Sequence, residues 1–258
     1  LLIIASARPE KSLVIGKGGW VVGKLKEELK VDHIHVEAYS DILLCKYRIE
    51  LAFGKLEEVK SDFEDEMCIP LDNLSKLLEK RIEQPYNLKS ILEDFSGYSK
   101  SNHHKAMVAL SGGVDSSFSL IVAEKMGFHP LAVTVNPGDI ILPKYFRDRV
   151  ETITGKLDVE HRYLDADMSP VIDGALEGRY HPCGRCSKVI EETILDYAQK
   201  EGVPFLIFGD LLATGAQSSV YRGDILRINL PAMLSATKGE TKALAREYGV
   251  TSTGGYGC

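Results

Sequence analysis

The residues most suited to chemistry lie in two short segments, and the first is the heptad Ser-Gly-Gly-Val-Asp-Ser-Ser at residues 111–117. It follows an apolar run at residues 107–110 and leads into a helix-like stretch at residues 117–126. Glycine lets the backbone approach an anion closely, and the start of a helix points unpaired N–H groups at it. Ser111 and Ser116 add hydroxyl donors. The heptad predicts a phosphate-binding loop, and the absence of a Gly-Lys-Ser/Thr ending separates it from the Walker loop.

The second segment is His-Pro-Cys-Gly-Arg-Cys at residues 181–186, just before or at the start of a predicted helix at residues 187–199. The start of a helix stabilises a thiolate, so we expect Cys183 and Cys186 to be nucleophilic and able to bind soft metals. A third cysteine, Cys258, lies far along the chain, after the glycine-rich residues 253–257. These residues predict a thiol site.

Alternating strands and helices from residue 105 onward must position both segments. Strands are expected at residues 106–110, 131–136, 159–164, 205–209 and 225–230, and helices at 117–126, 145–154, 187–199 and 239–248. The strands are almost continuously apolar, as a sheet covered on both faces requires. The pattern predicts an α/β fold with a doubly wound parallel sheet, whose ligands bind beyond the carboxyl ends of the strands. The phosphate loop lies at such an end.

The first hundred residues have a different pattern. A strand at residues 1–7, a break at Arg8-Pro9, a helix at 11–15, the turn Gly16-Lys17-Gly18-Gly19, a helix at 20–29 and a strand at 34–39 are expected in that order. Predicted helices follow at 55–63, 71–83 and 88–95, and Pro70 and Pro85 are expected to separate them. His104, which comes after these helices, is expected to be exposed to solvent. The predicted division is a small α+β domain at 1–40, a helical connector at 41–100 and the α/β domain at 101–258.

Composition narrows the class of protein. A chain of 258 residues with 44% hydrophobic and 26% charged residues has the composition of an ordinary globular protein. No apolar run approaches membrane-spanning length and no secretory pattern opens the chain, so no membrane partner is expected. Five cysteines without an export signal indicate a reducing, cytoplasmic compartment. Cys45 and Cys68, in apolar helical surroundings, are expected to be inert core thiols.

The distribution of charge and the two ends of the sequence lead to two further expectations. The net charge of −6 argues weakly against a nucleic-acid partner, but residues 8–30 contain six bases against three acids. The N-terminal part is therefore locally basic. Leu1 is not a natural start and the chain stops within a glycine-rich stretch, so we expect both ends to be cut.

The heptad 111–117 resembles the SGGxDS signature of the PP-loop ATP pyrophosphatase family. The resemblance implies an adenine nucleotide alpha hydrolase-like sheet that binds ATP and Mg²⁺, cleaves ATP between the α and β phosphates and activates a carbonyl oxygen as its adenylate. It implies ATP contacts at ten positions, which are Leu110, Ser111, Gly112, Gly113, Val114, Asp115, Ser116, Val135, Gly209 and Thr214. Asp115 is also the residue that it implies for catalysis.

Two close cysteines and one distant cysteine on such a sheet resemble the tRNA thiolation branch of this family, the thiouridine and thiocytidine sulfurtransferases. The resemblance implies that Cys183, Cys186 and Cys258 hold a 4Fe-4S cluster and leave one iron open for an extra sulfide. The residues themselves also allow a persulfide or disulfide relay, zinc with help from His181, or plain structural thiols.

The match to this branch is incomplete after the fourth predicted strand. The cluster-dependent 2-thiolases carry an aspartate pair where this chain has Ala213 and Thr214, and Thr214-Gly215 is closer to the 4-thiouridine branch. Asp210 could replace the missing acid. Lys188 is a candidate for orienting the substrate, or a solvated helix charge.

The segment around Gly16-Lys17-Gly18-Gly19 resembles the core of a KH RNA-binding domain. The resemblance covers residues 1–40, which include the helices and strands on either side of the glycine turn. The resemblance implies a loop that clamps the sugar-phosphate backbone of about four nucleotides. The alternative is a flexible glycine turn that binds no RNA.

Together these resemblances imply an ATP-dependent tRNA sulfurtransferase that adenylates a uridine (or cytidine) carbonyl and replaces its oxygen with sulfur. The partners would be tRNA and a sulfur donor, either sulfide or a sulfur carrier, and a homodimer is the candidate assembly. Two alternatives stay open, a PP-loop amide-forming ligase with structural zinc and a non-catalytic RNA-binding protein that ATP regulates.

Overall fold

The six-stranded sheet forms the centre of the molecule in a computed structural model that describes residues 1–86, 88–95, 104–138, 142–211 and 214–251. Its strand order is β5-β4-β3-β6-β8-β7. The strands are β3 (Lys105–Ala109), β4 (His129–Asn136), β5 (His161–Asp165), β6 (Phe205–Phe208), β7 (Ser219–Arg222) and β8 (Ile225–Asn229). All neighbours pair in parallel except β7 and β8. The predicted parallel sheet is confirmed.

The antiparallel strand β7 was not predicted. It forms a hairpin with β8, because Arg222 pairs with Ile225 and only Gly223 and Asp224 turn the chain between them. Gly223 adopts a φ of +59°, which a two-residue hairpin turn requires. The Gly-Asp pair was the signal for this turn, but the four-residue strand before it is too short to show periodicity.

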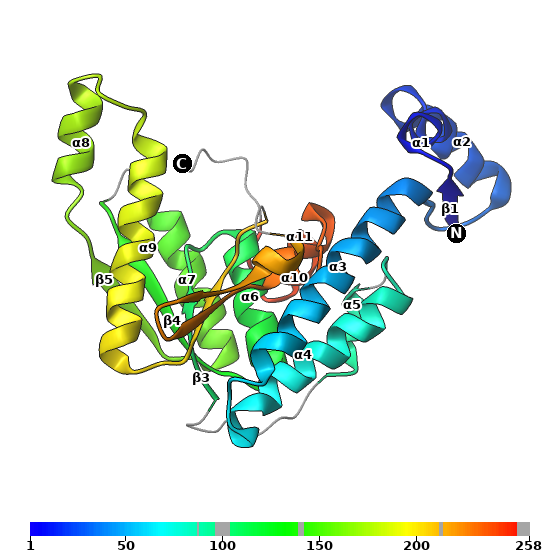
Figure 1. Cartoon of the computed structure of the whole chain (residues 1–258). Coiled ribbons are helices and arrows are strands. Elements are labelled where there is room, and N and C mark those ends of the chain that lie inside the picture. The colour runs from blue at the N-terminus through cyan, green and yellow to red at the C-terminus, as the bar shows by residue number, and fades with distance from the viewer. Residues whose placement is uncertain (87, 96–103, 139–141, 212–213, 252–258) are drawn as a thin grey trace.

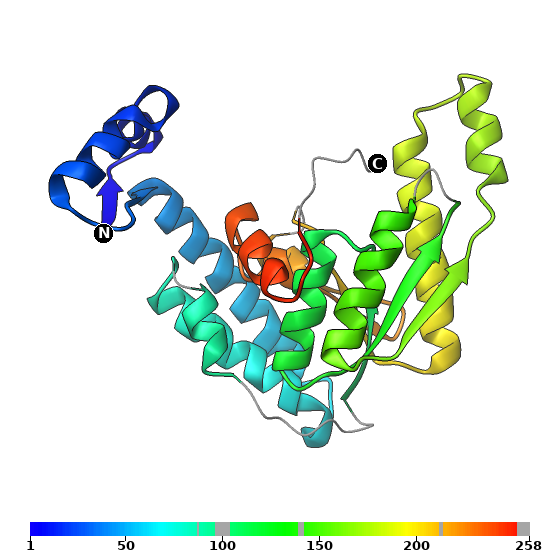
Figure 2. The ribbon, with the colours of Figure 1, turned by 180° about the vertical axis from the view of Figure 1, so that it is seen from behind.

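Helices cover both faces of the sheet (Figure 1; Figure 2). They are α6 (Val114–Lys125), α7 (Lys144–Leu157), α8 (Ser169–Leu176), α9 (Pro182–Glu201), α10 (Leu230–Met233) and α11 (Lys238–Glu247). Strand β3 shows the two-sided burial: Ala106 and Val108 pack in one core cluster, whereas Met107 packs in another with Ile194 and Ala198 of α9. This is why the strand is apolar throughout rather than alternating.

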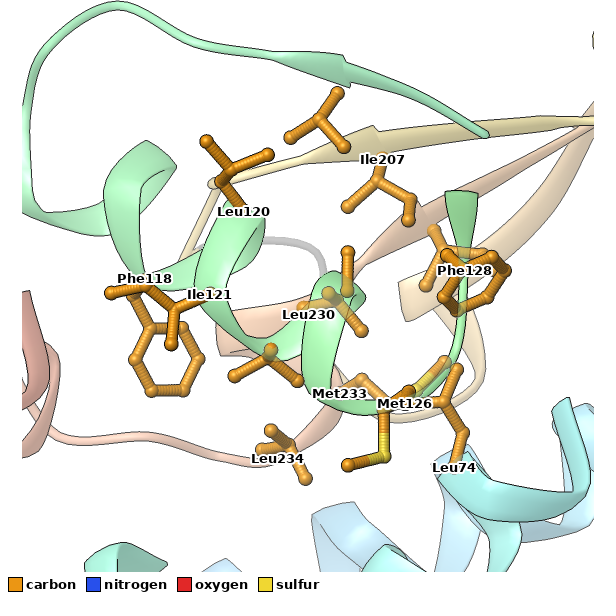
Figure 3. Close-up of a cluster of buried hydrophobic side chains, with 14 of the residues drawn as sticks. Leu74, Phe118, Leu120, Ile121, Met126, Phe128, Ile207, Leu230, Met233 and Leu234 are labelled. Atoms are coloured by element: carbon orange, nitrogen blue, oxygen red, sulfur yellow. The ribbon is translucent and has the colours of Figure 1, made fainter. Parts of the chain in front are cut away.

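The connector shares its core with the sheet. In Figure 3, Phe118 and Ile121 of α6, Ile207 of β6 and Met233 of α10 lie in one cluster with Leu74, which comes from helix α4. All five side chains are buried. Truncating a fully buried leucine such as Leu74 to alanine typically costs about 2–5 kcal/mol. The connector is thus part of the structural unit that carries the phosphate loop.

Three helices form the connector: α3 (Tyr39–Lys60), α4 (Asp65–Glu83) and α5 (Leu88–Glu93). The first helix predicted at residues 55–63 is present, but its bounds were wrong, because α3 runs for 22 residues from the end of the strand before it. Its buried residues Ile42, Ile49, Leu56 and Val59 recur at helical spacing along one face. No break in the chain marks the predicted boundary at residue 41.

Pro70 and His104 also depart from expectation. Pro70 lies inside α4 rather than ending a helix, and it has no N–H to donate to the carbonyl of Glu66. The Nε2 atom of His104 lies 2.7 Å from that carbonyl and donates to it. His104 is therefore buried, not solvated, and it supplies the hydrogen bond that the proline removes.

The N-terminal unit contains β1 (Leu2–Ala5), α1 (Arg8–Ile15), a short 3-10 turn η1 (Lys17–Gly19), α2 (Trp20–Leu29) and β2 (His35–Ala38). The predicted order is confirmed, and β1 and β2 pair in parallel. Helix α1 begins at Arg8 rather than after Pro9, because a proline in the first turn of a helix needs no N–H partner. The unit lies at the N-terminal end of α3, away from the larger sheet (Figure 1).

Candidate nucleotide and thiol site

The phosphate loop is held by its own serine hydroxyl groups. The backbone N–H of Ser111 donates to Ser116 Oγ at 3.1 Å, and the two serine Oγ atoms are also 3.1 Å apart. Ser116 Oγ in turn donates to the carbonyl of Gly113 at 3.1 Å. These bonds fold the loop back on the first turn of α6, so the helix begins at Val114, before the predicted start at Ser117.

That early start leaves donors at the mouth of the loop. The first bond of the helix runs from the N–H of Ser117 to the carbonyl of Gly113, at 3.0 Å. The N–H groups of Val114, Asp115 and Ser116 therefore lie outside the helical ladder, and no side chain caps them in the described part of the chain. A set of unpaired N–H groups at the positive end of a helix fits the phosphates of a nucleotide.

Two glycines make the loop possible. Gly112 has a φ of +75°, and a Cβ atom there would lie 2.5 Å from the carbonyl oxygen of Phe146. A Cβ atom on Gly209 would lie 2.6 Å from the backbone nitrogen of Ser116. The end of β6 thus touches the start of α6, and the hydroxyl of Ser119 bonds the carbonyl of Phe208 at 2.9 Å beside it. The structure brings the predicted residues Gly112 and Gly209 to the same loop.

The side chain of Asp115 contacts the start of α11. Its carboxylate contacts the ammonium group of Lys238 and accepts a hydrogen bond from Thr241 Oγ1 at 2.8 Å. Lys238 is half exposed, so a positive charge stands at the edge of the phosphate loop. Lys238 was not among the predicted site residues. The signal available was Thr237 with Glu240 three positions on, which form the capping box that starts α11.

Asp210 follows β6 and pairs with Arg227 of β8. Asp210 Oδ2 lies 2.9 Å from Arg227 Nη2, and the guanidinium stacks over the ring of Phe208 at 4.5 Å. Glu191 of α9 lies 3.5 Å from Arg227 Nε. Burial raises the pKa of the Asp210 carboxyl above its ordinary value, the nearby Glu191 adds to the rise, and Arg227 opposes it. More than half of the Asp210 side chain is nevertheless exposed, so solvent can reach the carboxyl group.

Burial restricts how several of the other predicted ATP-contacting residues could reach a ligand. The side chains of Leu110, Val114 and Val135 are buried in the core, which leaves only their backbone atoms for a ligand. Thr214 precedes the short 3-10 turn η3 (Gly215–Ser218). Ala213 lies outside the described residues.

Cys183 and Cys186 lie in the first turns of α9. The prediction that this helix starts at Ser187 was wrong by five residues, because Pro182 begins it and the ring nitrogen Nδ1 of His181 accepts the N–H of Cys183 at 3.5 Å. Cys183 is exposed, Cys186 is partly buried, and neither forms a disulfide in the described part of the chain.

The start of α9 stands beyond the sheet. Ile190, Ile194 and Ala198 of this helix pack on the sheet, whereas its first two turns and α8 project past the carboxyl ends of β4 and β5 (Figure 1; Figure 2). Since α6 follows β3 directly, the phosphate loop lies at the same end of the sheet. The thiols and the phosphate loop therefore share an end of the sheet.

The remaining predicted residues of the thiol site are less defined. Lys188 Nζ lies 3.5 Å from Glu192, one turn on, and both side chains are exposed. Cys258 lies outside the described residues. Among residues 1–251, apart from the undescribed gaps, no three His, Cys, Asp or Glu side chains group as metal ligands. Cys45 Sγ lies 3.9 Å from the carbonyl oxygen of Ser235 and Cys68 Sγ lies 3.5 Å from that of Lys60, and burial raises the pKa of the Cys68 thiol.

No helix within the described ranges has both the length and the apolar character needed to cross a membrane.

The parallel sheet and the glycine loop define a member of the adenine nucleotide alpha hydrolase-like PP-loop superfamily, to which tRNA thiolases are related. Within it, the chain belongs to the same family as the uncharacterized protein MJ1638 of Methanocaldococcus jannaschii. The two are 36% identical over 198 residues, which cover 73% of this chain and 75% of that protein. No family model matches the chain.

Two relatives with named activities are more distant. The chain is 29% identical over 167 residues to the tRNA-specific 2-thiouridylase MnmA of Pelotomaculum thermopropionicum, covering 57% of this chain and 44% of that enzyme. It is 24% identical over 199 residues to the tRNA-cytidine(32) 2-sulfurtransferase of Marinobacter nauticus, covering 71% and 60%. The matched region spans less than two thirds of either thiolase.

Proposed function

We propose that this chain is an ATP-dependent tRNA sulfurtransferase, which adenylates a uridine or cytidine carbonyl and replaces its oxygen with sulfur. The observation that carries the proposal is the placement of the phosphate loop and of Cys183 and Cys186 at one end of the sheet. The distant relation to two enzymes named for tRNA thiolation supports it.

The phosphate loop would bind the triphosphate of ATP. The N–H groups of Val114, Asp115 and Ser116 and the ammonium group of Lys238 face the developing negative charge. Mg²⁺ prefers carboxylate oxygen, and Asp115 offers the carboxylate that would hold it. The target carbonyl oxygen attacks the α phosphorus, a C–O–P bond forms, and pyrophosphate leaves from the loop.

The second step would occur beside α9. Cys183 and Cys186, three positions apart on one helix, present two thiols that suit soft metals, with Cys258 as the third proposed ligand. A 4Fe-4S cluster held by these thiolates would bind sulfide from the sulfur donor, and that sulfide would replace the oxygen. The carbon–sulfur bond forms as the carbon–oxygen bond breaks, and AMP leaves. Asp210, with its raised pKa, is the proposed acid–base group.

The N-terminal unit would hold the RNA. Gly16, Gly18 and Gly19 all have positive φ, and a Cβ atom on Gly16 would lie 2.4 Å from Val21. These conformations expose the backbone of the turn between α1 and α2, with Lys17 beside it. This is the arrangement expected of a KH-like loop that grips a sugar-phosphate backbone.

The proposal is tested on the full chain purified without oxygen. With unmodified tRNA, ATP and sulfide, it should release AMP and pyrophosphate and form a thionucleoside, and bound iron and labile sulfide should be present. Unchanged turnover in Cys183→Ala would refute the role of the thiols. Zinc without iron, together with ATP-dependent amide formation and no thionucleoside, would support the amide-forming ligase instead.

A further inference from the structure

The carboxylate of Glu240 joins the helical connector to the first turn of α11. Glu240 Oε2 accepts the N–H of Thr237 at 2.8 Å and lies 3.0 Å from Thr237 Oγ1, which closes the capping box. The same carboxylate accepts Arg81 Nη2, with its two oxygens at 2.7 and 2.9 Å. Arg81 belongs to α4, so one carboxylate fixes the start of α11 to the connector.

The other side of that turn contacts the phosphate loop. Lys238 and Thr241, which flank Glu240 in the sequence, both bind the carboxylate of Asp115. A displacement of Glu240 would move both contacts, because all three residues belong to a single helical turn. The connector and the phosphate loop are thus linked through two ion pairs and one helix start.

Stability alone does not account for an arginine at position 81. The side chain is completely buried, its Nη1 atom has no hydrogen-bond partner in the described part of the chain, and its Nε atom is 3.5 Å from the carbonyl of Leu234. Replacing a buried ion pair by apolar side chains of similar volume is often neutral or stabilising. What a guanidinium supplies, and an apolar side chain does not, is a fixed direction for the carboxylate that it binds.

We propose that Arg81 is a positioning residue for the phosphate loop. By fixing Glu240, it holds Lys238 and Thr241 against Asp115 and sets the affinity of the loop for the pyrophosphate portion of ATP. The proposal rests on the ATP site proposed above, and it gives the connector a role in nucleotide binding.

The test is calorimetric titration of the full chain with ATP, pyrophosphate and adenosine. In Arg81→Met, whose side chain keeps most of the volume, affinity for ATP and pyrophosphate should fall roughly tenfold, the effect of one charge-assisted hydrogen bond. Affinity for adenosine should not change, and Arg81→Lys should recover part of the loss. Lys80→Met is the matched control, because Lys80 is the neighbouring cation and pairs with the exposed Asp94.

Two results would overturn the proposal. One is wild-type affinity for pyrophosphate in a folded Arg81→Met chain, and the other is an equal loss for adenosine, which a general loss of structure would produce. If Arg81→Met does not fold, Glu240→Gln keeps the acceptor of the capping box and removes the ion pair, and it should show the same selective loss. A wild-type chain that binds neither ATP nor pyrophosphate would refute the proposed function instead.

Discussion

The α carbon of Gly209 lies so close to Ser116 that a Cβ atom on it would stand 2.6 Å from the Ser116 backbone nitrogen. This contact joins the end of β6 to the first turn of α6, whose N–H groups form the mouth of the phosphate loop. Any side chain at position 209 must therefore displace one of the proposed phosphate donors.

Gly209→Ala should weaken ATP binding by roughly tenfold and lower the melting temperature, since overpacking a tight contact costs about 1–3 kcal/mol. Both are measured on one preparation by titration with ATP and by thermal unfolding. Gly54→Ala is the control, because Gly54 lies inside α3 with nothing within 4 Å of its added Cβ. That change should raise stability by up to about 1 kcal/mol. Wild-type ATP affinity in Gly209→Ala would contradict the account of the loop.

Removing Arg227 should change the pH dependence of the reaction. Arg227 lowers the pKa of Asp210 against the effect of burial, so Arg227→Gln should raise that pKa further. If Asp210 acts as a carboxylate, the acidic limb of the pH profile of AMP formation should move to higher pH. Arg222→Gln is the matched control, because Arg222 lies 3.8 Å from Glu191 but has no contact with Asp210 among the described interactions. A profile that does not move would exclude Asp210 as the titrating group.

Acid should destabilise the N-terminal unit through Glu37. Partial burial raises the pKa of its carboxyl, but hydrogen bonds from Lys11 at 2.8 Å and His35 at 2.6 Å outweigh burial and lower it below the ordinary 4.5. The stabilisation is full above pH 4.5 and is lost as the pH falls through the lowered pKa. Wild type should therefore lose stability in that range, and Glu37→Gln should lack this loss and be less stable at neutral pH.

The fluorescence of Trp20, the single tryptophan of the chain, reports this unit directly. Glu10→Gln is the control, since Glu10 is an exposed carboxyl of the same unit. Identical acid transitions in wild type and Glu37→Gln would show that the Lys11–Glu37 pair contributes nothing to the unit.

Lys17 should contribute to RNA binding if the glycine turn grips phosphates. Lys17→Ala should weaken binding of single-stranded RNA for every sequence tested and reduce the slope of log K against log salt by about 0.7. Filter binding of the full chain at several salt concentrations measures both effects. Lys76→Ala, an exposed lysine on α4, should leave both unchanged. If Lys17→Ala binds RNA with the same affinity and the same salt dependence as the wild-type chain, the glycine turn is a linker that does not bind RNA.

The sequence predicted the parts of the molecule whose signal is local. The glycine loop before α6, the alternation of strands and helices and the Gly16–Gly19 turn each depend on a few neighbouring residues. The starts of α6 and α9 were placed too late, because the bonds that extend them come from Ser116 and His181, and such side-chain bonds have no periodicity. The length of α3 was missed because its apolar spacing includes partly exposed positions.

The contacts around the proposed nucleotide site could not be predicted from spacing. Lys238 meets Asp115, and Arg81 meets Glu240, only because the chain folds helices from distant segments onto α6. The residues around Arg81 carry no local signal, and the capping box around Lys238 predicts the start of a helix but not a contact with Asp115. Pairings between distant side chains depend on the tertiary fold, whereas loop motifs do not.

The most direct measurement is mass spectrometry of nucleosides in tRNA from cells that lack this protein. One thiolated pyrimidine nucleoside should disappear, and the wild-type chain should restore it whereas Cys183→Ala should not. A full complement of thionucleosides in the deleted strain, or restoration by Cys183→Ala, would contradict the central claim that this chain transfers sulfur to tRNA.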